Sequence, residues 1–478
     1  MGLFSRADDH QWSQQHLSAY ASGDLSPGAR RRLERHAEDC AECGRGIRAL
    51  RALAGHAAGA VAAGTSAVVL AEKVAVGRVR LRPDPAAGEP LGHIRGEAMT
   101  VFADDGLPLH VEVTGPKDGA VTIIFCHGYA ASLDAWYYQH AGLGHSARLV
   151  FWDQRSHGRS GKSEPGLASI DQLGADLHRV LMAAAPDDMP VVLVGHSMGG
   201  MTVMALADQH PELFGSKVIG AALISTAAST VDTVNWLPAP LRPAFRWAMP
   251  SIMTGASKGR FADVVERSRQ SASDLAFLGT RWIAFGDSDV RPEVVDFLER
   301  MIRATPIGVV ADFCVALIGH EKRHALKVLG IVPVLVLTGD RDRVVDPACS
   351  DEIASAIPDA ELVTIHGAGH AVILERPEHI NEAIAGLATK ALAHEAERRE
   401  LTRKQSHVHR RDTGRPASGI HAHDKEDGAG HAAGRSAALH DLSPERAWLY
   451  EVRLAVPGWR RPRWHGRPRR SPGVIIDT

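Results

Sequence analysis

Residues Gly195-His196-Ser197-Met198-Gly199 form a Gly-x-Ser-x-Gly motif between two segments of different character. The apolar, β-branched run 191–194 before the motif is typical of a buried strand, and residues 201–209 after it have the pattern of a helix. A strand, a tight turn and a helix in this order hold a serine hydroxyl at the tip of a strained turn. Glycines two positions either side let the strand and the helix approach closely. Ser197 is therefore our candidate nucleophile.

A serine hydroxyl is a weak nucleophile until a base removes its proton, so Ser197 requires a histidine and an acid elsewhere. In a fold with this kind of turn, the acid and then the histidine follow the serine along the chain. Two later strand ends carry these residue types: Asp340 and Asp342 follow the apolar run 334–337, and His366 and His370 follow the run 361–365.

Residues 99–392 resemble the α/β-hydrolase superfamily, in its esterase, lipase and haloperoxidase-like branch. The resemblance rests on the serine motif and on four further motifs in the family's order: Phe125-Cys126-His127-Gly128, Asp153 to Ser160, Gly339-x-x-Asp342 and Gly369-His370. It implies that Asp342 is the acid and His370 the base, with Asp340 as the alternative acid. It implies no organic cofactor. Ser156 departs from the family, which frequently has glycine at that place.

The resemblance also indicates how a tetrahedral intermediate is stabilised. Two backbone N–H donors are needed, those of Met198 at the start of the helix and of Tyr129 in the loop after His127-Gly128. The implied activity is that of a serine hydrolase, in which Ser197 attacks an ester or related acyl carbonyl and water later releases the acyl group. A perhydrolase or a carbon–carbon bond hydrolase uses the same triad, and both remain alternatives.

Four other histidines lie in or beside these motifs. His196 adjoins Ser197, but neighbouring side chains point apart on such a turn, so we do not expect it to act as the base. We interpret His127, His157 and His366 as structural loop residues as well.

A second cluster of reactive residues lies near the N-terminus. His36, Cys40 and Cys43 stand in an H-x3-C-x2-C arrangement, which places the first two one helical turn apart and the third in the turn that follows. The set suits tetrahedral zinc, and His10 and His16 are upstream donors for the fourth position. Four protein ligands leave no place for a substrate, so the zinc is expected to be structural. The alternative is a helical hairpin that binds no metal, in which the two cysteines serve only as small side chains.

Residues 17–27 and 36–43 resemble the zinc-finger module of bacterial anti-sigma factors. In that family the first ligand lies ten residues before the tyrosine, which makes it His10 here, although cysteine is frequent at that place. The resemblance implies a sigma-like protein as partner. It makes a regulatory protein the rival hypothesis, with the hydrolase body as effector or with Cys40 and Cys43 as sensors of oxidation.

The pattern of the remaining chain predicts an α/β fold. After an initial hairpin, apolar strands alternate with helices, which is typical of a mostly parallel sheet covered on both faces. The expected helix before the serine strand is 170–185, and the other expected strands are 100–102, 107–113, 121–126, 149–152, 218–224, 332–337 and 361–365.

An insertion over 227–329 interrupts this alternation. Its methionines and aromatic residues are typical of a helical cap over an apolar acyl pocket, and they are Trp236, Phe245, Trp247, Met249, Met253, Phe277, Trp282 and Phe285. Each of them, taken singly, is expected to pack the cap on the body.

Four parts follow from these patterns. They are a zinc module over 1–50, an Ala-rich helix and linker over 51–97, a hydrolase domain over 98–395, and a tail over 396–478. The tail is rich in charge, Gly and His, so we expect it to be disordered.

The composition limits which kinds of partner and which cellular compartment we expect. The formal net charge of −2 gives no reason to expect nucleic acid as a partner, and five cysteines in 478 residues do not make a disulfide framework. Residues 1–20 lack the basic start and apolar core of a secretory signal, so we expect a cytoplasmic protein. Residues 52–71 contain no Asp, Glu, Lys or Arg, and their length suits a membrane span, which leaves membrane association as the alternative.

Overall fold

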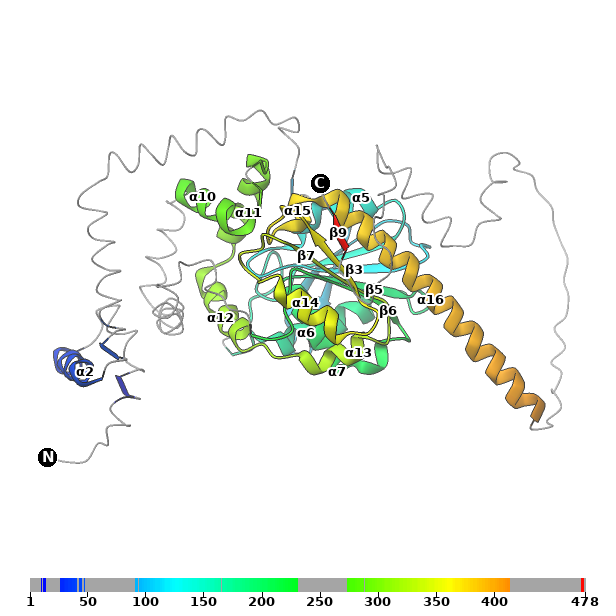
Figure 1. Ribbon diagram of the computed structural model, residues 1–478, viewed down its shortest axis with the longest axis horizontal. Coiled ribbons are helices and arrows are strands. Elements are labelled where there is room, and N and C mark those ends of the chain that lie inside the picture. The colour runs from blue at the N-terminus through cyan, green and yellow to red at the C-terminus, as the bar shows by residue number, and fades with distance from the viewer. Residues whose placement is uncertain are drawn as a thin grey trace.

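A nine-stranded sheet forms the centre of the computed structural model, in the order β1-β2-β4-β3-β5-β6-β7-β8-β9 (Figure 1). The structure describes residues 10, 12–13, 26–40, 43–44, 47, 91–92, 94–164, 166–230, 273–287, 289–412 and 474–476. The strands are β1 Glu97–Phe102, β2 Pro108–Thr114, β3 Thr122–Cys126, β4 Arg148–Trp152, β5 Val191–His196, β6 Val218–Ile224, β7 Val334–Gly339, β8 Glu361–Ile365 and β9 Val474–Ile476.

Only the first part of the sheet is antiparallel. β1 pairs with β2 as a hairpin and β2 pairs antiparallel with β4, whereas every pair from β4–β3 to β8–β9 is parallel. The carboxyl ends of the parallel strands therefore lie at one edge of the sheet, where the loops that follow them meet. The predicted mostly parallel α/β sheet is confirmed.

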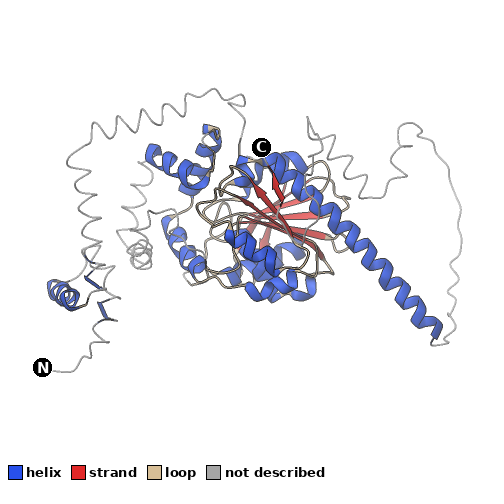
Figure 2. Cartoon of the chain, viewed as in Figure 1, coloured by secondary structure: helices blue, strands red, loops and turns tan. Residues whose placement is uncertain are grey.

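Helices cover both faces of the sheet, as Figure 2 shows. One face carries α5 Tyr137–Leu143, α15 Val372–Glu375 and α16 Pro377–Asp412, and the other carries α6 Ile170–Ala184, α7 Met198–Gln209, α13 Leu326–Leu329 and α14 Ala348–Ala356. Successive residues of β3 alternate between the two layers: Ile123 and Phe125 belong to one hydrophobic core, and Ile124 and Cys126 to the other. Burial on both faces explains why these strands are apolar throughout.

The described part of the insertion 227–329 contains α10 Ser273–Ala284, α11 Pro292–Ala304 and α12 Ile307–Ile318, and it ends with the short helix α13. Phe277 and Phe285 are buried in the core as expected, whereas Trp282 is 52% exposed. The expectations for the remaining aromatic and methionine residues of the insertion lie outside the described residues, and these are Trp236, Phe245, Trp247, Met249 and Met253.

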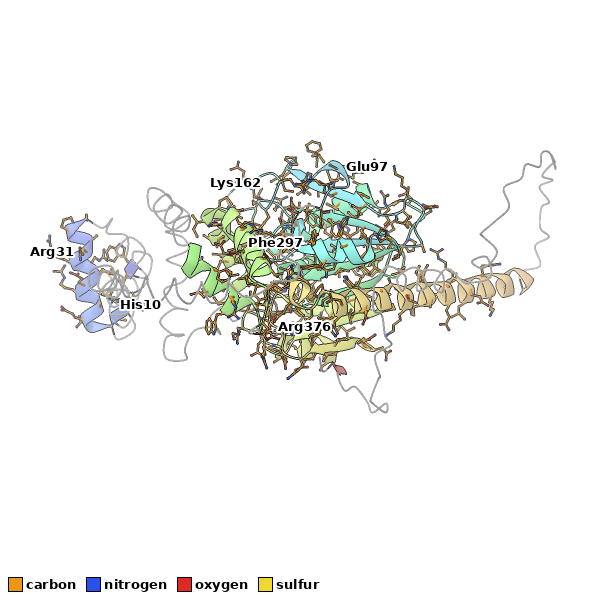
Figure 3. All side chains as sticks on the ribbon, turned by 90° about the horizontal axis from the view of Figure 1, so that it is seen from above. His10, Arg31, Glu97, Lys162, Phe297 and Arg376 are labelled. Atoms are coloured by element: carbon orange, nitrogen blue, oxygen red, sulfur yellow. The ribbon has the colours of Figure 1, made fainter. Side chains whose placement is uncertain are left out.

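The body begins earlier than the expected boundary at residue 98. Leu91 and Ile94 are buried in the same core as Phe297 of α11, which is labelled in Figure 3. Gly92 adopts φ of +85°, and a Cβ atom there would lie 2.4 Å from the Phe297 ring. The Ile94 N–H donates to Asp134 Oδ1 at 3.3 Å. These contacts attach the last linker residues to the hydrolase-like body. The Arg- and Pro-rich sequence of the linker did not suggest this attachment.

The expected disordered tail from residue 396 is wrong for two segments. Helix α16 continues to Asp412, where side chains at i and i+4 pair, such as Glu395 with Arg399 at 2.6 Å. Residues Val474–Ile476 form β9 and extend the sheet beside β8. The rest of the tail lies outside the described residues.

The segment 52–71, the candidate membrane span, also lies outside the described residues. Among those described, no single helix has the length and apolarity needed to cross a membrane. Helices α11 and α12 reach that criterion only as a pair, and they are bent by 94°.

Candidate active site

The turn between β5 and α7 holds Ser197 in a strained backbone conformation, with φ of 54° and ψ of −121°. Two glycines make the turn possible. A Cβ atom on Gly195 would lie 2.4 Å from the Gly199 carbonyl oxygen, and one on Gly199 would lie 2.0 Å from the Cys126 carbonyl oxygen. Because Cβ atoms cannot approach so closely, only glycine lets β5, α7 and β3 meet here.

Ser197 faces a relay of two further side chains. Its Oγ lies 3.1 Å from His370 Nε2, and His370 Nδ1 lies 2.9 Å from Asp342 Oδ2. The other carboxylate oxygen of Asp342 accepts the N–H groups of Val344 at 2.8 Å and Val345 at 2.9 Å. The Asp342 side chain is fully buried, so these bonds fix the orientation of the carboxylate and, through it, of the imidazole.

The alternative acid, Asp340, points to a different histidine. Its Oδ2 lies 2.5 Å from His366 Nδ1, and its Oδ1 accepts the Gly367 N–H at 2.7 Å. The structure thus brings Asp342, rather than Asp340, to His370. The pair of Asp340 and His366 ties together the loops that follow β7 and β8.

Three buried histidines around the site are held in the neutral form. Burial is the main cause that lowers the pKa of His127 to about 4, of His157 to about 3 and of His196 to about 3. His127 donates to the Gly128 carbonyl and accepts the Gln154 N–H, and His157 donates to the Arg155 carbonyl. Their hydrogen bonds are those of structural loop residues.

A cavity of about 520 Å³ opens beside Ser197 and His370. Tyr129 and Ala131 line it from the loop after β3, and the described part of the insertion supplies Thr280, Ile283, Ala284, Leu298, Ile302, Ile307, Val310, Cys314 and Leu317. None of the described lining residues is Asp, Glu, Lys or Arg. The cavity therefore favours an uncharged, apolar ligand.

The two candidate oxyanion donors stand on different elements. Met198 is the first residue of α7, so its N–H has no acceptor within the helix. Tyr129 lines the cavity, and its hydroxyl donates to the Val310 carbonyl of α12. That bond attaches the loop after β3 to the insertion, a link that sequence reasoning missed.

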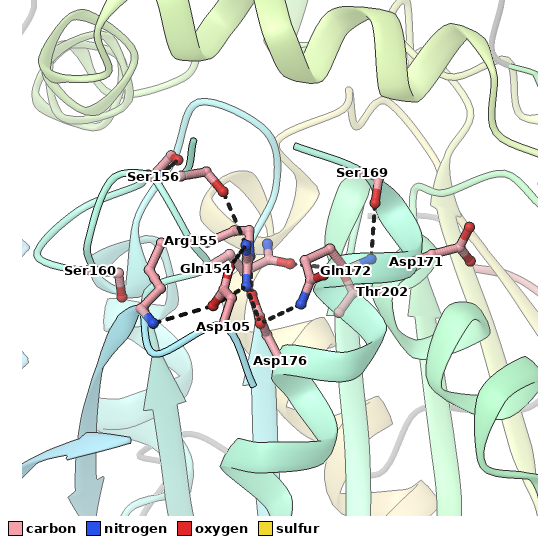
Figure 4. A network of polar contacts seen from close by, with 12 residues as sticks. Asp105, Gln154, Arg155, Ser156, Ser160, Ser169, Asp171, Gln172, Asp176 and Thr202 are labelled. Atoms are coloured by element: carbon pink, nitrogen blue, oxygen red, sulfur yellow. Dashed lines mark hydrogen bonds and ion pairs between the residues drawn. The ribbon is translucent and has the colours of Figure 1, made fainter. Parts of the chain in front are cut away.

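A buried polar network supports the loop after β4 (Figure 4). The Arg155 guanidinium is fully buried and donates twice to Asp176, at 2.6 and 2.7 Å, and to Asp105 at 2.9 Å. Burial raises the pKa of Asp176, whereas the hydrogen bond from Arg155 lowers that of Asp105. Sequence reasoning missed this network, although Arg155 lies inside a family motif.

Next to this network, Gln154 joins the loop after β3 to α7. Its side-chain amide donates to the His127 carbonyl at 2.6 Å and accepts the Thr202 hydroxyl at 2.6 Å. Ser156 adopts φ of 68°, the left-handed conformation that glycine takes without cost. Ser156 thus adopts the backbone conformation that a glycine at this place favours.

The four predicted metal ligands come together near the N-terminus. Donor atoms of His10, His36, Cys40 and Cys43 all lie within 4.8 Å of one another. His10 Nδ1 lies 3.4 Å from Cys40 Sγ and 3.5 Å from Cys43 Sγ, close to the spacing of about 3.5 Å between the ligands of a tetrahedral zinc ion. The buried His36 Nε2 has no hydrogen-bond partner among the described residues, as a metal-binding nitrogen requires.

The local fold explains how these ligands meet. Helix α2 spans Pro27–Asp39, and Ser26 caps its N-terminus by accepting the Ala29 N–H at 3.3 Å. His36 lies in the last turn of α2 and Cys40 is its C-cap, so both project from the same end of the helix. The other upstream donor, His16, lies outside the described residues.

Comparison with known families agrees with both parts of the chain. Residues 121–377 match the model of the alpha/beta hydrolase fold family. Residues 11–44 match a zinc-finger family model, which includes three of the four donors and begins one residue after His10. The resemblance to the zinc-finger module is thereby confirmed.

Two curated bacterial proteins are similar to the chain. The dihydrolipoyllysine-residue acetyltransferase component of the acetoin cleaving system of Pseudomonas putida is 27% identical over 278 residues, which are 57% of this chain and 65% of that protein. The AB hydrolase superfamily protein YisY of Bacillus subtilis is 28% identical over 266 residues, 55% of this chain and 90% of that protein. The chain thus spans less than two thirds of the first relative and most of the second.

Among solved structures, a thermophilic esterase from Thermogutta terrifontis is 22% identical, with a TM-score of 0.49, and the match covers 62% of this chain and 99% of that one. The family model decides the assignment, because residues 121–377 are more than half of the 478 residues. The chain belongs to the α/β-hydrolase family.

Proposed function

We propose that the protein is a serine hydrolase that cleaves an ester or a related acyl bond. The observation that carries this proposal is the hydrogen-bonded series from Ser197 Oγ through His370 to Asp342. His370 takes the proton of Ser197 as the oxygen attacks the acyl carbonyl and then gives it to the leaving group. Asp342 holds the imidazole in position and stabilises its charged form. Water, activated by the same histidine, releases the acyl group from Ser197.

We assign the oxyanion donors to the backbone N–H groups of Met198 and Tyr129. The position of Met198 at the N-terminus of α7 supports its role, because N-terminal N–H groups and the helix dipole favour a negative oxygen. The position of Tyr129 in the cavity wall supports the second donor. Both are main-chain donors, so they act without a side-chain rearrangement.

We further propose an apolar acyl group for the substrate. The support is the cavity of about 520 Å³ with apolar lining from the insertion, next to the proposed nucleophile. Burial of each methylene contributes about 0.8 kcal/mol, so a longer aliphatic chain gains affinity there until the cavity is full.

Hydrolysis of p-nitrophenyl esters from acetate to decanoate by the wild type and by Ser197→Ala tests the proposed activity. We expect the variant to lose at least about 10³-fold in kcat, because the nucleophile is gone. Equal turnover by both proteins would overturn the proposal. Two product analyses test the alternative activities. Formation of a peracid from an ester and hydrogen peroxide would indicate a perhydrolase, and cleavage of a 1,3-diketone would indicate a carbon–carbon bond hydrolase.

A fluorophosphonate probe gives a second test that needs no known substrate. The probe reacts with a serine that an adjacent base activates, and peptide mapping identifies the labelled residue. We expect the label on Ser197. A label on another residue would contradict the assignment of the nucleophile.

For the N-terminal part, we propose that His10, His36, Cys40 and Cys43 bind a structural zinc ion. The spacing of the donors supports this, and so does His36 Nε2, which has no hydrogen-bond partner in the described part of the chain. The cysteines must be thiolates to bind zinc, and none of the five cysteines forms a disulfide. Both points suit a reducing cytoplasmic location. A sigma-like protein is our proposed partner for this module, with the hydrolase as effector. Retention of a sigma factor by the full-length protein, and not by Cys40→Ser, tests this.

A further inference from the structure

The carboxylate of Glu375 connects two segments that belong to different parts of the site. Glu375 ends helix α15 and is 8% exposed. Its Oε2 accepts the N–H of Gly369, the residue before His370, at 2.7 Å. Its Oε1 accepts the N–H of Asp287, just after α10, at 2.8 Å, and both oxygens lie 3.2 Å from the Gly286 nitrogen. One buried carboxylate thus accepts three main-chain donors.

The two segments also touch through their backbones. The Ala371 N–H donates to the Ala284 carbonyl at 2.8 Å. A Cβ atom on Gly286 would lie 2.4 Å from the Gly367 carbonyl oxygen, and one on Gly369 would lie 2.5 Å from the Gly286 nitrogen. Only glycine at both places allows this approach. The end of α10 and the loop that carries His370 therefore pack as one unit around the Glu375 carboxylate.

We propose that Glu375 is a positioning residue, which sets the place of His370 relative to Ser197 by holding the loop at Gly369 to the end of α10. The inference rests on the proposed function of Ser197 and His370. Hydrogen bonds to a carboxylate are about twice as strong as those between neutral groups, and a misplacement of about 1 Å in a catalytic group costs about 10²-fold in rate. Because α10 also lines the cavity with Thr280 and Ile283, the same carboxylate couples the cavity wall to the base.

The substitution Glu375→Gln tests this role with almost no change in volume. An amide keeps one oxygen but replaces the other with an NH2 group, which cannot accept a main-chain N–H. One of the two segments therefore loses its acceptor and faces another donor. We expect labelling of Ser197 by a small fluorophosphonate, and kcat for p-nitrophenyl acetate, to fall about 10- to 100-fold. We expect KM for this short ester to stay within about twofold, since acetate does not reach the far cavity wall.

Arg376→Met is the matched control. Arg376 pairs with Asp287 at 3.0 Å, so it also links the end of α15 to the end of α10, but the hydrogen bond of the Gly369 N–H goes to Glu375. We expect Arg376→Met to be labelled within about twofold of the wild-type rate. If the labelling rate fell equally in both variants, any weakening of the contact between α15 and the end of α10 would have the same effect. That result would overturn a specific role for Glu375.

Thermal unfolding of each variant separates positioning from folding. A Glu375→Gln protein that unfolds near the wild-type temperature yet is labelled slowly supports the inference, and one labelled at the wild-type rate overturns it. If this variant does not accumulate in folded form, Gly286→Ala decides, because its methyl group displaces the loop while the carboxylate stays. Wild-type labelling of Gly286→Ala would overturn the inference. Failure of the wild type to label at Ser197 would overturn the proposed function and this inference with it.

Discussion

His196 donates a hydrogen bond from its imidazole Nε2 to the main-chain carbonyl of His370, at 2.8 Å. The residue before the proposed nucleophile thus holds the backbone of the residue that carries the proposed base. The two rings lie 5.0 Å apart between centroids, and the indole of Trp136 contacts His196 in a T-shaped arrangement. A histidine that stands beside Ser197 in the sequence therefore contributes to the position of His370 and not to proton transfer.

Replacing His196 with Phe should keep the ring packing and remove the donor. The carbonyl of His370 then loses this partly buried hydrogen bond, which costs about 1 kcal/mol of unfolding free energy. Urea unfolding followed by tryptophan fluorescence measures this loss. We also expect slower fluorophosphonate labelling of Ser197. A variant as stable and as reactive as the wild type would show that the bond contributes nothing.

The stability of the fold should fall in acid because of the buried neutral histidines. His157 has a folded pKa of about 3, whereas the unfolded value is about 6.5. Below pH about 6.5 the unfolded chain binds a proton that the folded protein does not, so this stability is full above that pH and is lost toward pH about 3. Each such residue adds a slope of about 1.4 kcal/mol per pH unit.

The substitution His157→Gln isolates one of these contributions. We expect the plot of unfolding free energy against pH to flatten by about 1.4 kcal/mol per unit between pH 4 and 6, whatever the offset in absolute stability. Parallel curves for the two proteins would contradict the assignment of a neutral, buried His157.

The ion pair of Arg155 and Asp176 should matter more for stability than that of Arg155 and Asp105. Both side chains of the first pair are fully buried, whereas Asp105 is 28% exposed. We expect Asp176→Asn to cost about 3–5 kcal/mol, because the guanidinium keeps only part of its charge compensation in the interior. Asp105→Asn should cost clearly less in the same urea titration. An equal loss of unfolding free energy in the two variants would mean that the fully buried pair contributes no more to stability than the partly exposed one.

Cavity size should set the preferred acyl chain. Ile302→Phe adds volume to the lining, so kcat/KM for decanoate should fall at least about tenfold relative to that for acetate. Val315→Phe is the control, because Val315 lies on neighbouring α12 but is 54% exposed and is not among the lining residues. A shift of chain-length preference in the control, or none in Ile302→Phe, would place the acyl group elsewhere.

Zinc content should depend on the N-terminal ligands alone. We expect full-length protein purified under reducing conditions to hold about one zinc ion, and Cys43→Ser to hold much less. Ester hydrolysis should persist in Cys43→Ser, because the proposed zinc takes no part in the acyl chemistry. Metal analysis together with the ester assay checks both points. A metal-free wild type would refute the zinc site.

Local patterns in the sequence were enough for the strands β1 to β8, the turn at Ser197 and the cluster of His36, Cys40 and Cys43. These features depend on residues within a few positions of one another, whose periodicity, glycines and spacing are visible in one dimension. The same reasoning placed the β6 and β8 strands at the bounds that the structure has, 218–224 and 361–365.

The family motifs pointed to Asp342 and His370, with Asp340 as the alternative acid, but only the tertiary structure decided which of these groups meet. Ser197 and His370 are 173 residues apart, and the pairing of His370 with Asp342 instead of Asp340 follows from the path of the loops after β7 and β8. The burial of residues 91–94 and the continuation of α16 past residue 395 also depend on surfaces supplied by distant segments. The role proposed for Glu375 belongs here as well. Its three donors come from two loops far apart in the sequence, and no spacing in the sequence reveals that one carboxylate will reach them all.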